Sequence, residues 1–328
     1  MQHNEKEYSV VIIGQITLDD AVLVDAPVKQ DCPGGDGLYA LSGAYIWNRG
    51  KHGLVVRRGC DFDLDQIAKI TGDRVNFDGV VSVPDVPNIH IWNMFDRKGN
   101  RYFIDQVWSG AQEYMAPRPE DIPRSYIESS KAVHIAAMPI EWEQELIRAM
   151  PLNGTSDLIV QVDPHFEGVY AQHRELWKEL LQHITIFQPS ELEFTRLFGL
   201  ENFENVADYI PYLKKITSYG PKVCSVKLGG RGALVYSRET EECYHVPIYS
   251  NENVVDVTGC GDTFCGGFIT SYIEDGDIFK AAVKASVSAS FNIEHYGCME
   301  NFSIPYEAVQ ERFEQFYHSL DKEACRLL

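Results

Sequence analysis

A glycine-rich stretch at residues 256–268, Asp-Val-Thr-Gly-Cys-Gly-Asp-Thr-Phe-Cys-Gly-Gly-Phe, constrains the fold most strongly. It follows a strand-like run, Asn253–Val255, and opens a long helical pattern. Gly259 and Gly261 lack a Cβ, so the backbone can turn sharply there and bring bare amide groups close to a ligand. Because the turn leads into a helix N-terminus, its amides and the helix dipole favour a bound anion such as phosphate.

Asp262 stands at the mouth of this predicted anion site. A carboxylate there repels a phosphate unless it has a chemical task. It could accept the proton of an attacking hydroxyl while the amides stabilise charge on a transferred phosphoryl group. The plainer interpretation is an acid that complements the helix dipole. On this evidence alone, Asp262 is either a catalytic base or a helix-capping residue.

Apolar runs along the chain predict an α/β fold. Residues 8–14 are typical of a buried first strand. Beyond residue 120, strand patterns at 132–136 and 158–164 alternate with helical patterns at 141–150 and 173–182, as in a parallel sheet with crossover helices. The first strand is not followed by Gly-x-Gly-x-x-Gly, which disfavours a nucleotide-binding dehydrogenase.

A second β-rich region predicts a separate small sheet. Runs at 79–83, 89–95 and 101–104 alternate apolar and polar residues, and a glycine-containing turn separates the last two. An antiparallel hairpin of this kind would not extend a parallel core. A shorter β-like run, 21–24, comes earlier in the chain.

Several motifs, taken in order, resemble one family. The stretch at 256–262 reads Asp-x-Thr-Gly-x-Gly-Asp, and before it come Gly34-Gly35, Gln-Pro-Ser-Glu at 188–191 and Lys-x-Gly-x-x-Gly at 227–232. The series resembles the ribokinase-like (PfkB) family of sugar and nucleoside kinases over roughly the whole chain. The resemblance implies an ATP- and Mg²⁺-dependent kinase that phosphorylates a hydroxyl of a sugar or sugar-like acceptor.

The resemblance also implies an architecture. It predicts a single ribokinase-like domain over residues 1–328, an α/β fold with a mostly parallel central sheet flanked by helices. The small sheet would be a lid over the acceptor, with strands at 17–26 and 78–106. In this family the lid is also a surface through which two copies can form a homodimer.

The family's motifs carry site residues over to this chain. The resemblance makes Asp262 the base and places the amides of Gly259, Cys260 and Gly261 around the phosphoryl group. The residues that it implies for the acceptor are Asp20, Gly34, Gly35 and Tyr39. Of the adjacent acids Asp19 and Asp20 we favour Asp20, and Tyr39 stands where family members have Asn.

The resemblance also assigns a nucleotide side. The residues that it implies for ATP are Lys227, Gly229, Gly232, Thr258 and Asn292. Glu191 is predicted to position Mg²⁺ through water, because this ion keeps much of its water shell. Asp256 is predicted to lie near a K⁺ ion that relatives hold through backbone oxygens.

Composition limits the partners. The formal charge of −19, without a basic run, argues against nucleic acid and anionic membranes. No apolar run approaches the length that spans a bilayer. Residues 1–7 are polar and charged, and the eight cysteines include no Cys-x-x-Cys pair. These features predict a cytoplasmic protein with reduced thiols.

Two other functions stay open. A nucleoside kinase of the same fold would use the same catalytic residues, and Tyr39 with lid aromatics such as Trp92 could stack on a base. The other alternative is a non-catalytic ligand-binding relative. The presence of both Asp262 and Glu191 argues against it.

Overall fold

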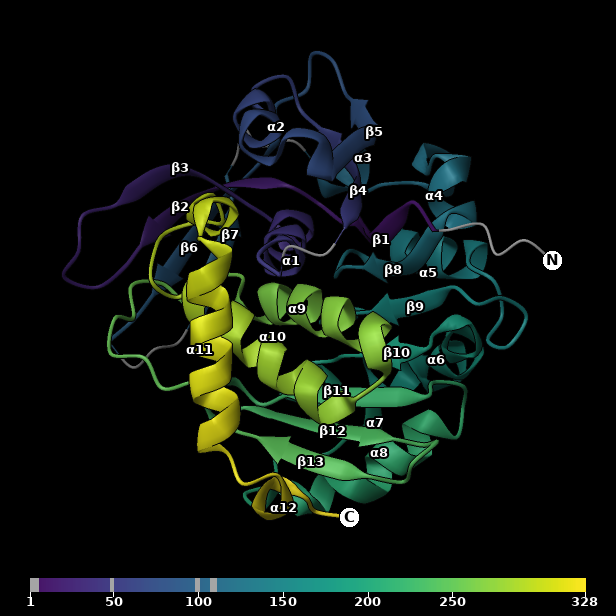
Figure 1. Cartoon of the computed structure of the whole chain (residues 1–328). Helices are drawn as coiled ribbons and strands as arrows, with labels where there is room; N and C mark the ends of the chain where they lie inside the picture. Colours follow the sequence, from purple (N-terminus) through teal and green to yellow (C-terminus); the bar gives the residue numbers. More distant parts are fainter. Residues whose placement is uncertain (1–5, 48–49, 98–100, 107–110) are drawn as a thin grey trace.

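The computed structural model describes residues 6–47, 50–97, 101–106 and 111–328. Its centre is a nine-stranded sheet in the order β13-β12-β11-β10-β9-β8-β1-β4-β5 (Figure 1). The seven strands from β11 to β5 in this order are parallel to one another. At the other edge β12 pairs antiparallel with β11, and β13 pairs antiparallel with β12. The strands are β1 (Tyr8–Ile13), β4 (Lys51–Arg58), β5 (Val75–Ser82), β8 (Ser130–Ile135), β9 (Ile159–Val162), β10 (Ile186–Phe187), β11 (Val223–Lys227), β12 (Ala233–Ser237) and β13 (Cys243–Val246).

Helices cover both faces of this sheet (Figure 1). One face carries α1 (Asp36–Tyr45), α9 (Cys260–Asp275) and α10 (Ile278–Asn292), and α11 (Tyr306–Ser319) packs on α10. The other face carries α4 (Arg124–Glu128), α5 (Ile140–Ala149), α6 (Arg174–Leu180), α7 (Glu191–Phe198) and α8 (Ile210–Thr217). The remaining α-helices are α2 (Asp65–Thr71), α3 (Gln112–Met115) and α12 (Lys322–Cys325). The predicted α/β fold, a mostly parallel sheet with flanking helices, is confirmed.

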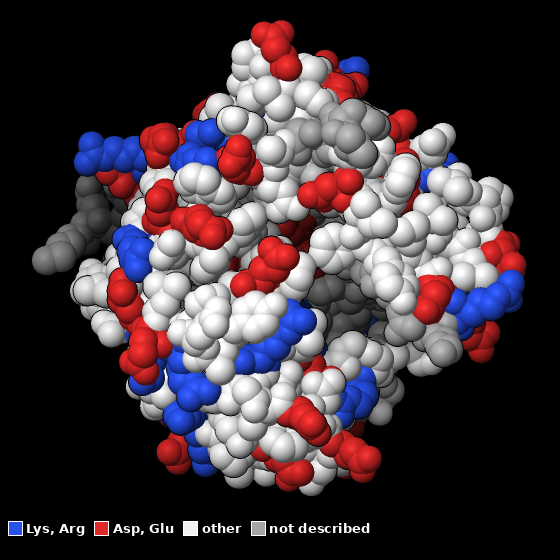
Figure 2. All heavy atoms as spheres, turned by 180° about the vertical axis from the view of Figure 1, so that it is seen from behind, with Lys and Arg blue, Asp and Glu red and all other residues white. Residues whose placement is uncertain are grey.

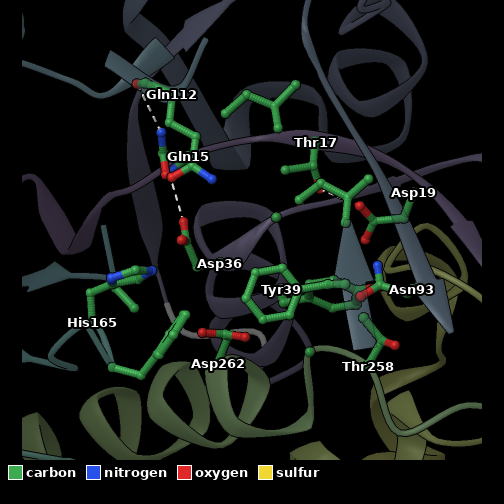
Figure 3. A pocket seen from close by; sticks show the side chains of 17 residues that line it. Gln15, Thr17, Asp19, Asp36, Tyr39, Asn93, Gln112, His165, Thr258 and Asp262 are labelled. Carbon is green, nitrogen blue, oxygen red and sulfur yellow. Dashed lines mark hydrogen bonds between the residues drawn. The ribbon is translucent and has the colours of Figure 1, made fainter. Parts of the chain in front are cut away.

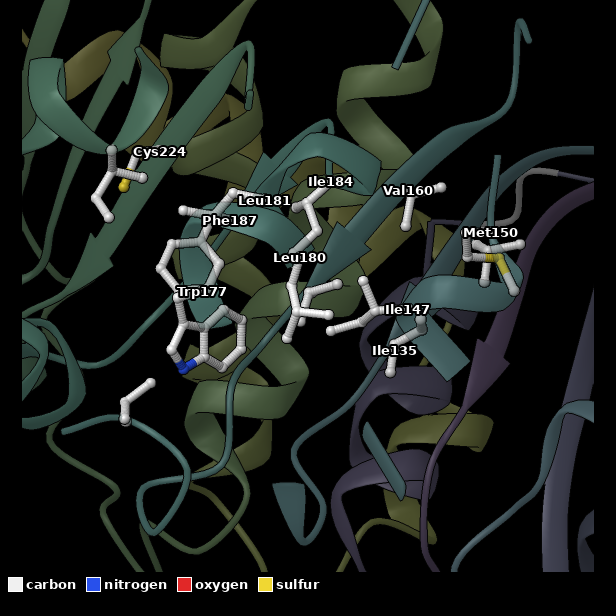
Figure 4. Close-up of a cluster of buried hydrophobic side chains, with 14 of the residues drawn as sticks. Ile135, Ile147, Met150, Val160, Trp177, Leu180, Leu181, Ile184, Phe187 and Cys224 are labelled. Carbon is white, nitrogen blue, oxygen red and sulfur yellow. The ribbon is translucent and has the colours of Figure 1, made fainter. Parts of the chain in front are cut away.

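A large apolar cluster fixes the central strands against α5 and α6. Ile135, Val160 and Phe187 of the sheet pack against Ile147 and Leu180 of these helices (Figure 4). Each side chain is at most 1% exposed. Burial of one such side chain contributes about 1.5–3 kcal/mol. The packing therefore holds rigid the strand ends that position the site.

A four-stranded sheet, separate from the large one, has the order β3-β2-β6-β7. Its strands are β2 (Thr17–Val22), β3 (Lys29–Gly34), β6 (Ile89–Phe95) and β7 (Arg101–Asp105). The predicted hairpin of β6 and β7 is confirmed as antiparallel, whereas β2 and β6 pair in parallel. Residues 98–100, in the predicted turn of the hairpin, lie outside the described residues.

Two local predictions were wrong, and one strand was missed. Residues 78–82 belong to β5 at the edge of the large sheet, because this run pairs with β4. The small sheet instead gains β3, which sequence reasoning missed because Lys29–Gly34 is mostly polar and contains a proline. Asn253–Val255 forms no strand. Instead the Val255 amide donates a hydrogen bond to the carbonyl of Ile293, which follows α10.

Glycines let α9 lie between α1 and α10. A Cβ on Gly43 of α1 would come well under 3.0 Å from the Thr263 backbone. A Cβ on Gly266 of α9 would likewise come well under 3.0 Å from the Ala40 carbonyl oxygen. Such close approach brings the two helix backbones into contact. Both helices begin at the same pocket, so their spacing sets the relative positions of their first turns.

None of the described helices combines the length and apolar composition that a bilayer-spanning helix requires. Acidic and basic side chains are interspersed over the face shown in Figure 2, which is hollowed near its middle.

Candidate active site

A pocket of about 200 Å³ lies between the carboxyl edge of the large sheet and the inner face of the small sheet (Figure 3). Open α/β sheets bind their ligands at this edge. The first turns of α1 and α9 line the pocket, together with inward side chains of β2 and β6. Its described polar side chains are Gln15, Thr17, Asp19, Asp36, Tyr39, Asn93, Gln112, His165, Thr258 and Asp262.

The loop before α9 places Asp262 in this pocket. Gly259 is the N-cap of α9 and has φ 73°, a left-handed conformation that favours glycine. Asp256 Oδ1 accepts hydrogen bonds from the Thr258 amide (2.9 Å) and hydroxyl (2.8 Å). Asp262 lies in the first turn of α9 and points into the pocket (Figure 3). The loop is thus held by its own first residue.

Asn292 fixes the same loop from behind. Its side chain is 1% exposed, and its amide Nδ2 donates to the Thr258 carbonyl at 2.7 Å. Asn301 Nδ2 in turn donates to Asn292 Oδ1 at 3.0 Å. We predicted that Asn292 contacts the nucleotide, but the structure turns it toward the loop. Its Nδ2 also lies 3.7 Å from the Cys260 thiol, in the first turn of α9.

On the acceptor side, Asp19 lines the pocket and the predicted Asp20 does not. Successive strand residues point to opposite faces, so only one of two neighbours can face inward. The Asp20 carboxylate accepts bonds from Trp92 Nε1 (3.1 Å) and Gln106 Nε2 (3.0 Å) on the outer face. Asp19 Oδ1 accepts a bond from the Thr17 hydroxyl at 2.7 Å inside the pocket.

Two glycines before α1 allow a tight approach. Gly35 has φ 94° and lines the pocket, and a Cβ there would lie 2.6 Å from the Gln15 carbonyl oxygen. A Cβ on Gly34 would lie 3.2 Å from the ring of Tyr39. The Tyr39 ring is 2% exposed and packs against Gly259, where a Cβ would overlap it. Tyr39 therefore links the loops that open α1 and α9.

A buried ion pair lies beneath the first turn of α9. Lys227, the last residue of β11, pairs with Asp163 after β9, and Cys265 Sγ lies 3.4 Å from the same carboxylate. Burial raises the pKa of Asp163 to about 6, although the ammonium group opposes the shift. A Cβ on Gly261 would lie 3.6 Å from Lys227 Nζ. The ammonium group is thus next to the predicted phosphate loop.

The structure separates the two carboxylates at the start of α7. The predicted metal residue Glu191 is bound by the Arg231 guanidinium and the Tyr209 hydroxyl. Glu193 instead accepts a hydrogen bond from the Ser190 amide at 2.6 Å and interacts electrostatically with Lys227 and Asp262. Residues two apart on a helix point about 200° apart, since each residue turns it by about 100°. Glu193, not Glu191, therefore faces the phosphate loop.

The predicted nucleotide loop between β11 and β12 forms a short 3₁₀ turn, η6 (Gly229–Arg231), bounded by Gly232. Gly229 (φ 57°) and Gly232 (φ 90°) adopt backbone conformations that favour glycine. A Cβ on Gly229 would meet nothing within 4 Å, whereas one on Gly232 would overlap Val246. The turn has open space on one side and packs on β13 on the other.

The model of the pfkB family carbohydrate kinases matches residues 62–305. The chain belongs to this family. Curated relatives include a cytidine kinase from Thermococcus kodakarensis, which is 28% identical over 80% of this chain and 88% of its own. A ribokinase from Arabidopsis thaliana is 32% identical over 75% of this chain and 63% of its own. The predicted family and kinase class are confirmed.

Solved structures of this family share the fold. The nucleoside kinase of Methanocaldococcus jannaschii has a TM-score of 0.71 at 20% identity, covering 95% of this chain and 100% of that one. The ribokinase of Arabidopsis thaliana with ribose and ATP has a TM-score of 0.71 at 22% identity, covering 95% and 99%. At these identities the likeness shows the fold alone.

Several pocket residues of this pfkB-family chain were missed from the sequence. Asp36, Asn93 and His165 lie outside the motifs that we recognised. Phe103 and Phe166 meet edge to face, with ring centroids 5.6 Å apart, on one wall of the pocket. These side chains come from four separate segments, so no local spacing marks them as a set. A polar residue beside a motif, such as Asp36 after Gly34-Gly35, was the only available signal.

Proposed function

We propose that this chain transfers the γ-phosphoryl group of ATP to a hydroxyl of a sugar or nucleoside bound in the pocket, with Asp262 as the base. The observation that carries the proposal is the placement of Asp262, which lines the pocket within the first turn of α9. The names of the relatives, a cytidine kinase and a ribokinase, support this acceptor class.

In this proposal Asp262 handles the proton, and the loop amides stabilise the transferred group. Asp262 orients the acceptor hydroxyl and takes its proton as the oxygen attacks phosphorus. The amides of Gly259, Cys260 and Gly261, at the positive end of α9, stabilise the charge that develops on the phosphoryl oxygens. The Asp256 and Asn292 bonds to Thr258 keep these amides in position before substrate arrives.

For the nucleotide side we propose Lys227, Gly229 and Gly232 as the border of ATP. Lys227 contributes a cation beneath the phosphate loop, and the open face of the Gly229 turn leaves room for the nucleotide. The structure of a homologous ribokinase with ATP and Mg²⁺ supports both as cofactors.

The residues present suit Mg²⁺, and we propose Glu193 as the carboxylate that orients its water shell. Glu193 interacts electrostatically with Lys227 and Asp262, and Mg²⁺ favours one or two carboxylates plus water and phosphate. When bound, the ion would offset negative charge on the phosphates. We further propose a K⁺ ion near Asp256, to be tested by turnover in K⁺ against Na⁺ salts.

On the acceptor side we propose Asp19, Gly34, Gly35 and Tyr39 as the binding surface. Asp19 takes the role that we had assigned to Asp20, because only Asp19 faces the pocket. Asn93 of β6 lines the same wall and can both donate and accept hydrogen bonds. The small sheet would then act as the lid of a single domain over residues 1–328.

We also propose that the outer face of the small sheet binds a second copy of the chain. Trp92, Tyr102 and Ile104 are 43%, 53% and 48% exposed there, an unusual concentration of apolar surface. The molar mass in solution tests this arrangement directly. The eight cysteines are unpaired, which suits a reducing cytoplasm.

The decisive experiment measures ADP release across sugars, polyols and nucleosides, with Asp262→Asn beside the native protein. We expect turnover of at least one acceptor and a loss of about 10²–10⁴-fold in kcat for Asp262→Asn. Asp65→Asn removes an exposed acid from the first turn of α2 and is the matched control. A native kcat in Asp262→Asn, with a native unfolding transition, would contradict the proposal.

A further inference from the structure

A chain of buried hydrogen bonds runs behind the pocket and ends at the loop that opens α9. Its two ends are the backbone carbonyls of Thr258 and Tyr39, and both residues line the pocket (Figure 3). Three polar side chains, each at most 1% exposed, form the chain: Ser42 of α1, Asn292 of α10 and Asn301 of the 3₁₀ turn η7 (Glu300–Ser303).

The direction of each hydrogen bond follows from these ends. A carbonyl oxygen only accepts, so Asn292 turns its Nδ2 toward Thr258, at 2.7 Å, and its Oδ1 away. Asn301 Nδ2 supplies the donor for that Oδ1, at 3.0 Å. The same nitrogen donates its second hydrogen to Ser42 Oγ at 3.0 Å, and the Ser42 hydroxyl donates to the Tyr39 carbonyl at 2.8 Å. One amide nitrogen of Asn301 thus joins the α9 loop to α1.

The segment after α10 holds Asn301 and the loop together. Both hydrogens of the Asn301 amide are used, and its Oδ1 accepts a hydrogen bond from Nε2 of the half-buried His295 at 2.9 Å. The Ile293 carbonyl accepts the amides of Val255 at 2.7 Å and Asp256 at 3.3 Å. This segment therefore fixes the start of the loop through its backbone, and the middle of the loop through the side-chain amides.

Removal of Asn301 would act on the loop through Asn292. Without its donor, the buried Asn292 Oδ1 would lose its partner, which is costly enough for the side chain to turn and release the Thr258 carbonyl. Gly259 and Cys260 follow Thr258 directly, so their amides would move with it. A shift of 1 Å at a catalytic centre can cost about 100-fold in rate.

We propose that Asn301 is a positioning residue for phosphoryl transfer. It acts through Asn292 on the Thr258 carbonyl, and Ser42 anchors it to α1. The proposal rests on the proposed kinase function and adds a remote residue to its machinery. Asn301 is not among the described residues that line the pocket, so its loss should affect turnover more than acceptor binding.

The test compares two Asn301 variants with a matched control. Asn301→Ala removes the whole amide, whereas Asn301→Asp keeps the volume and an acceptor for His295 but loses the Nδ2 donor, and it remains a test if Asn301→Ala does not fold. Asn153→Ala is the control, because Asn153 Nδ2 donates to the Ile184 carbonyl at 2.6 Å, just before β10 and away from the pocket. All kinetic assays use one KCl buffer, because a K⁺ ion is proposed near Asp256.

Turnover and stability are measured on each protein by ADP release and urea unfolding. We expect both Asn301 variants to lose about 10- to 100-fold in kcat, while the KM values for acceptor and ATP change by less than about threefold. Asn153→Ala should lower the urea midpoint and keep a native kcat. A native kcat in both Asn301 variants would overturn the proposal, as would an equal loss of kcat in Asn153→Ala.

A double variant tests the route through Asn292. Because Asn301 acts on the loop through Asn292, Asn292→Ala combined with Asn301→Ala should lose no more kcat than Asn292→Ala alone. If the two losses multiply instead, the residues act independently and the route is refuted.

Amide hydrogen exchange separates this proposal from the kinase function, because it needs no turnover. Exchange in residues 256–262, followed by mass spectrometry, should be faster in the Asn301 variants and native in Asn153→Ala. If the native protein turned over no acceptor, the kinase function would fail, and faster exchange in the Asn301 variants alone would still support the positioning of the loop. Native exchange of this segment in the Asn301 variants would refute the positioning in either case.

Discussion

Replacing Gly35 with alanine tests whether the site depends on the tight turn before α1. Gly35 has φ 94° and ψ 150°, a region that only glycine adopts readily, so the substitution costs about 1–3 kcal/mol in backbone strain. A Cβ there would also lie 2.6 Å from the Gln15 carbonyl oxygen and 2.7 Å from the Cα of Ile16. Because Cβ contacts essentially never fall under 3.0 Å, these backbones must separate by at least 3.0 − 2.6, or about 0.4 Å.

The separation adds an overpacking cost of about 1–3 kcal/mol and moves the first turn of α1 within the pocket. We therefore expect Gly35→Ala to lower the free energy of unfolding by about 2–6 kcal/mol in total. Acceptor kcat/KM should fall by about tenfold to 100-fold, since a shift of 1 Å at a catalytic centre can cost about 100-fold. Urea unfolding and ADP release measure the two effects.

Two glycines provide matched controls. Gly72 also has a positive φ, 56°, but a Cβ there would meet nothing within 4 Å, so Gly72→Ala isolates the backbone strain. Gly230 has neither a positive φ nor a near neighbour, so Gly230→Ala should change the free energy of unfolding little. If Gly35→Ala loses no more stability than Gly72→Ala and keeps native kcat/KM, the close contact with the Gln15 backbone is unimportant and the reasoning fails.

Two further substitutions test other parts of the structure. Tyr39→Phe keeps the ring that packs on Gly259, so this variant should retain its stability and turnover. Tyr39→Asn removes the ring and should lose about 3–5 kcal/mol in the free energy of unfolding. A large rise in acceptor KM for Tyr39→Phe would instead assign the phenol hydroxyl to substrate binding. Burial lowers the pKa of His134 to about 3, so as pH falls below 6.5 the unfolded chain takes up a proton that the folded chain refuses. The free energy of unfolding should therefore fall from pH 7 to pH 5, and urea titrations should show that fall to be about 2 kcal/mol smaller in His134→Gln. Equal pH dependence in the native protein and the variant would show that His134 is protonated in the fold.

The sequence motifs located the site but not the orientation of its side chains. The order of the motifs predicted the fold, and the Gly-x-Gly-Asp loop placed Asp262 in the pocket. The choice of Asp20 failed because strand register decides which of two neighbours faces inward. At Glu191 the sequence did not reveal that a partner distant in sequence, Arg231 of the β11–β12 turn, engages the carboxylate.

Residues from unrelated segments were beyond prediction because only the tertiary fold brings them together. Asn93 arrives from β6 through a parallel pairing with β2 that no local pattern announces. His165 and Phe166 follow β9, and Phe103 of β7 reaches them across the pocket. A hairpin could be predicted from its turn, but the face that it presents depends on its attachment to β2.

Two helix N-termini converge on this pocket, and the chain distinguishes them by their acids. Either positive helix end alone would attract an anion. At α1 the anion is supplied internally, because Asp36 sits in the first turn with its oxygen bonded to the Gln15 backbone. At α9 a Cβ on Gly261 in the first turn would lie 3.6 Å from Lys227 Nζ, and Asp262 lines the pocket. In the proposed transfer, α9 and Lys227 supply positive charge for the phosphoryl group, and the Asp262 carboxylate meets the acceptor hydroxyl.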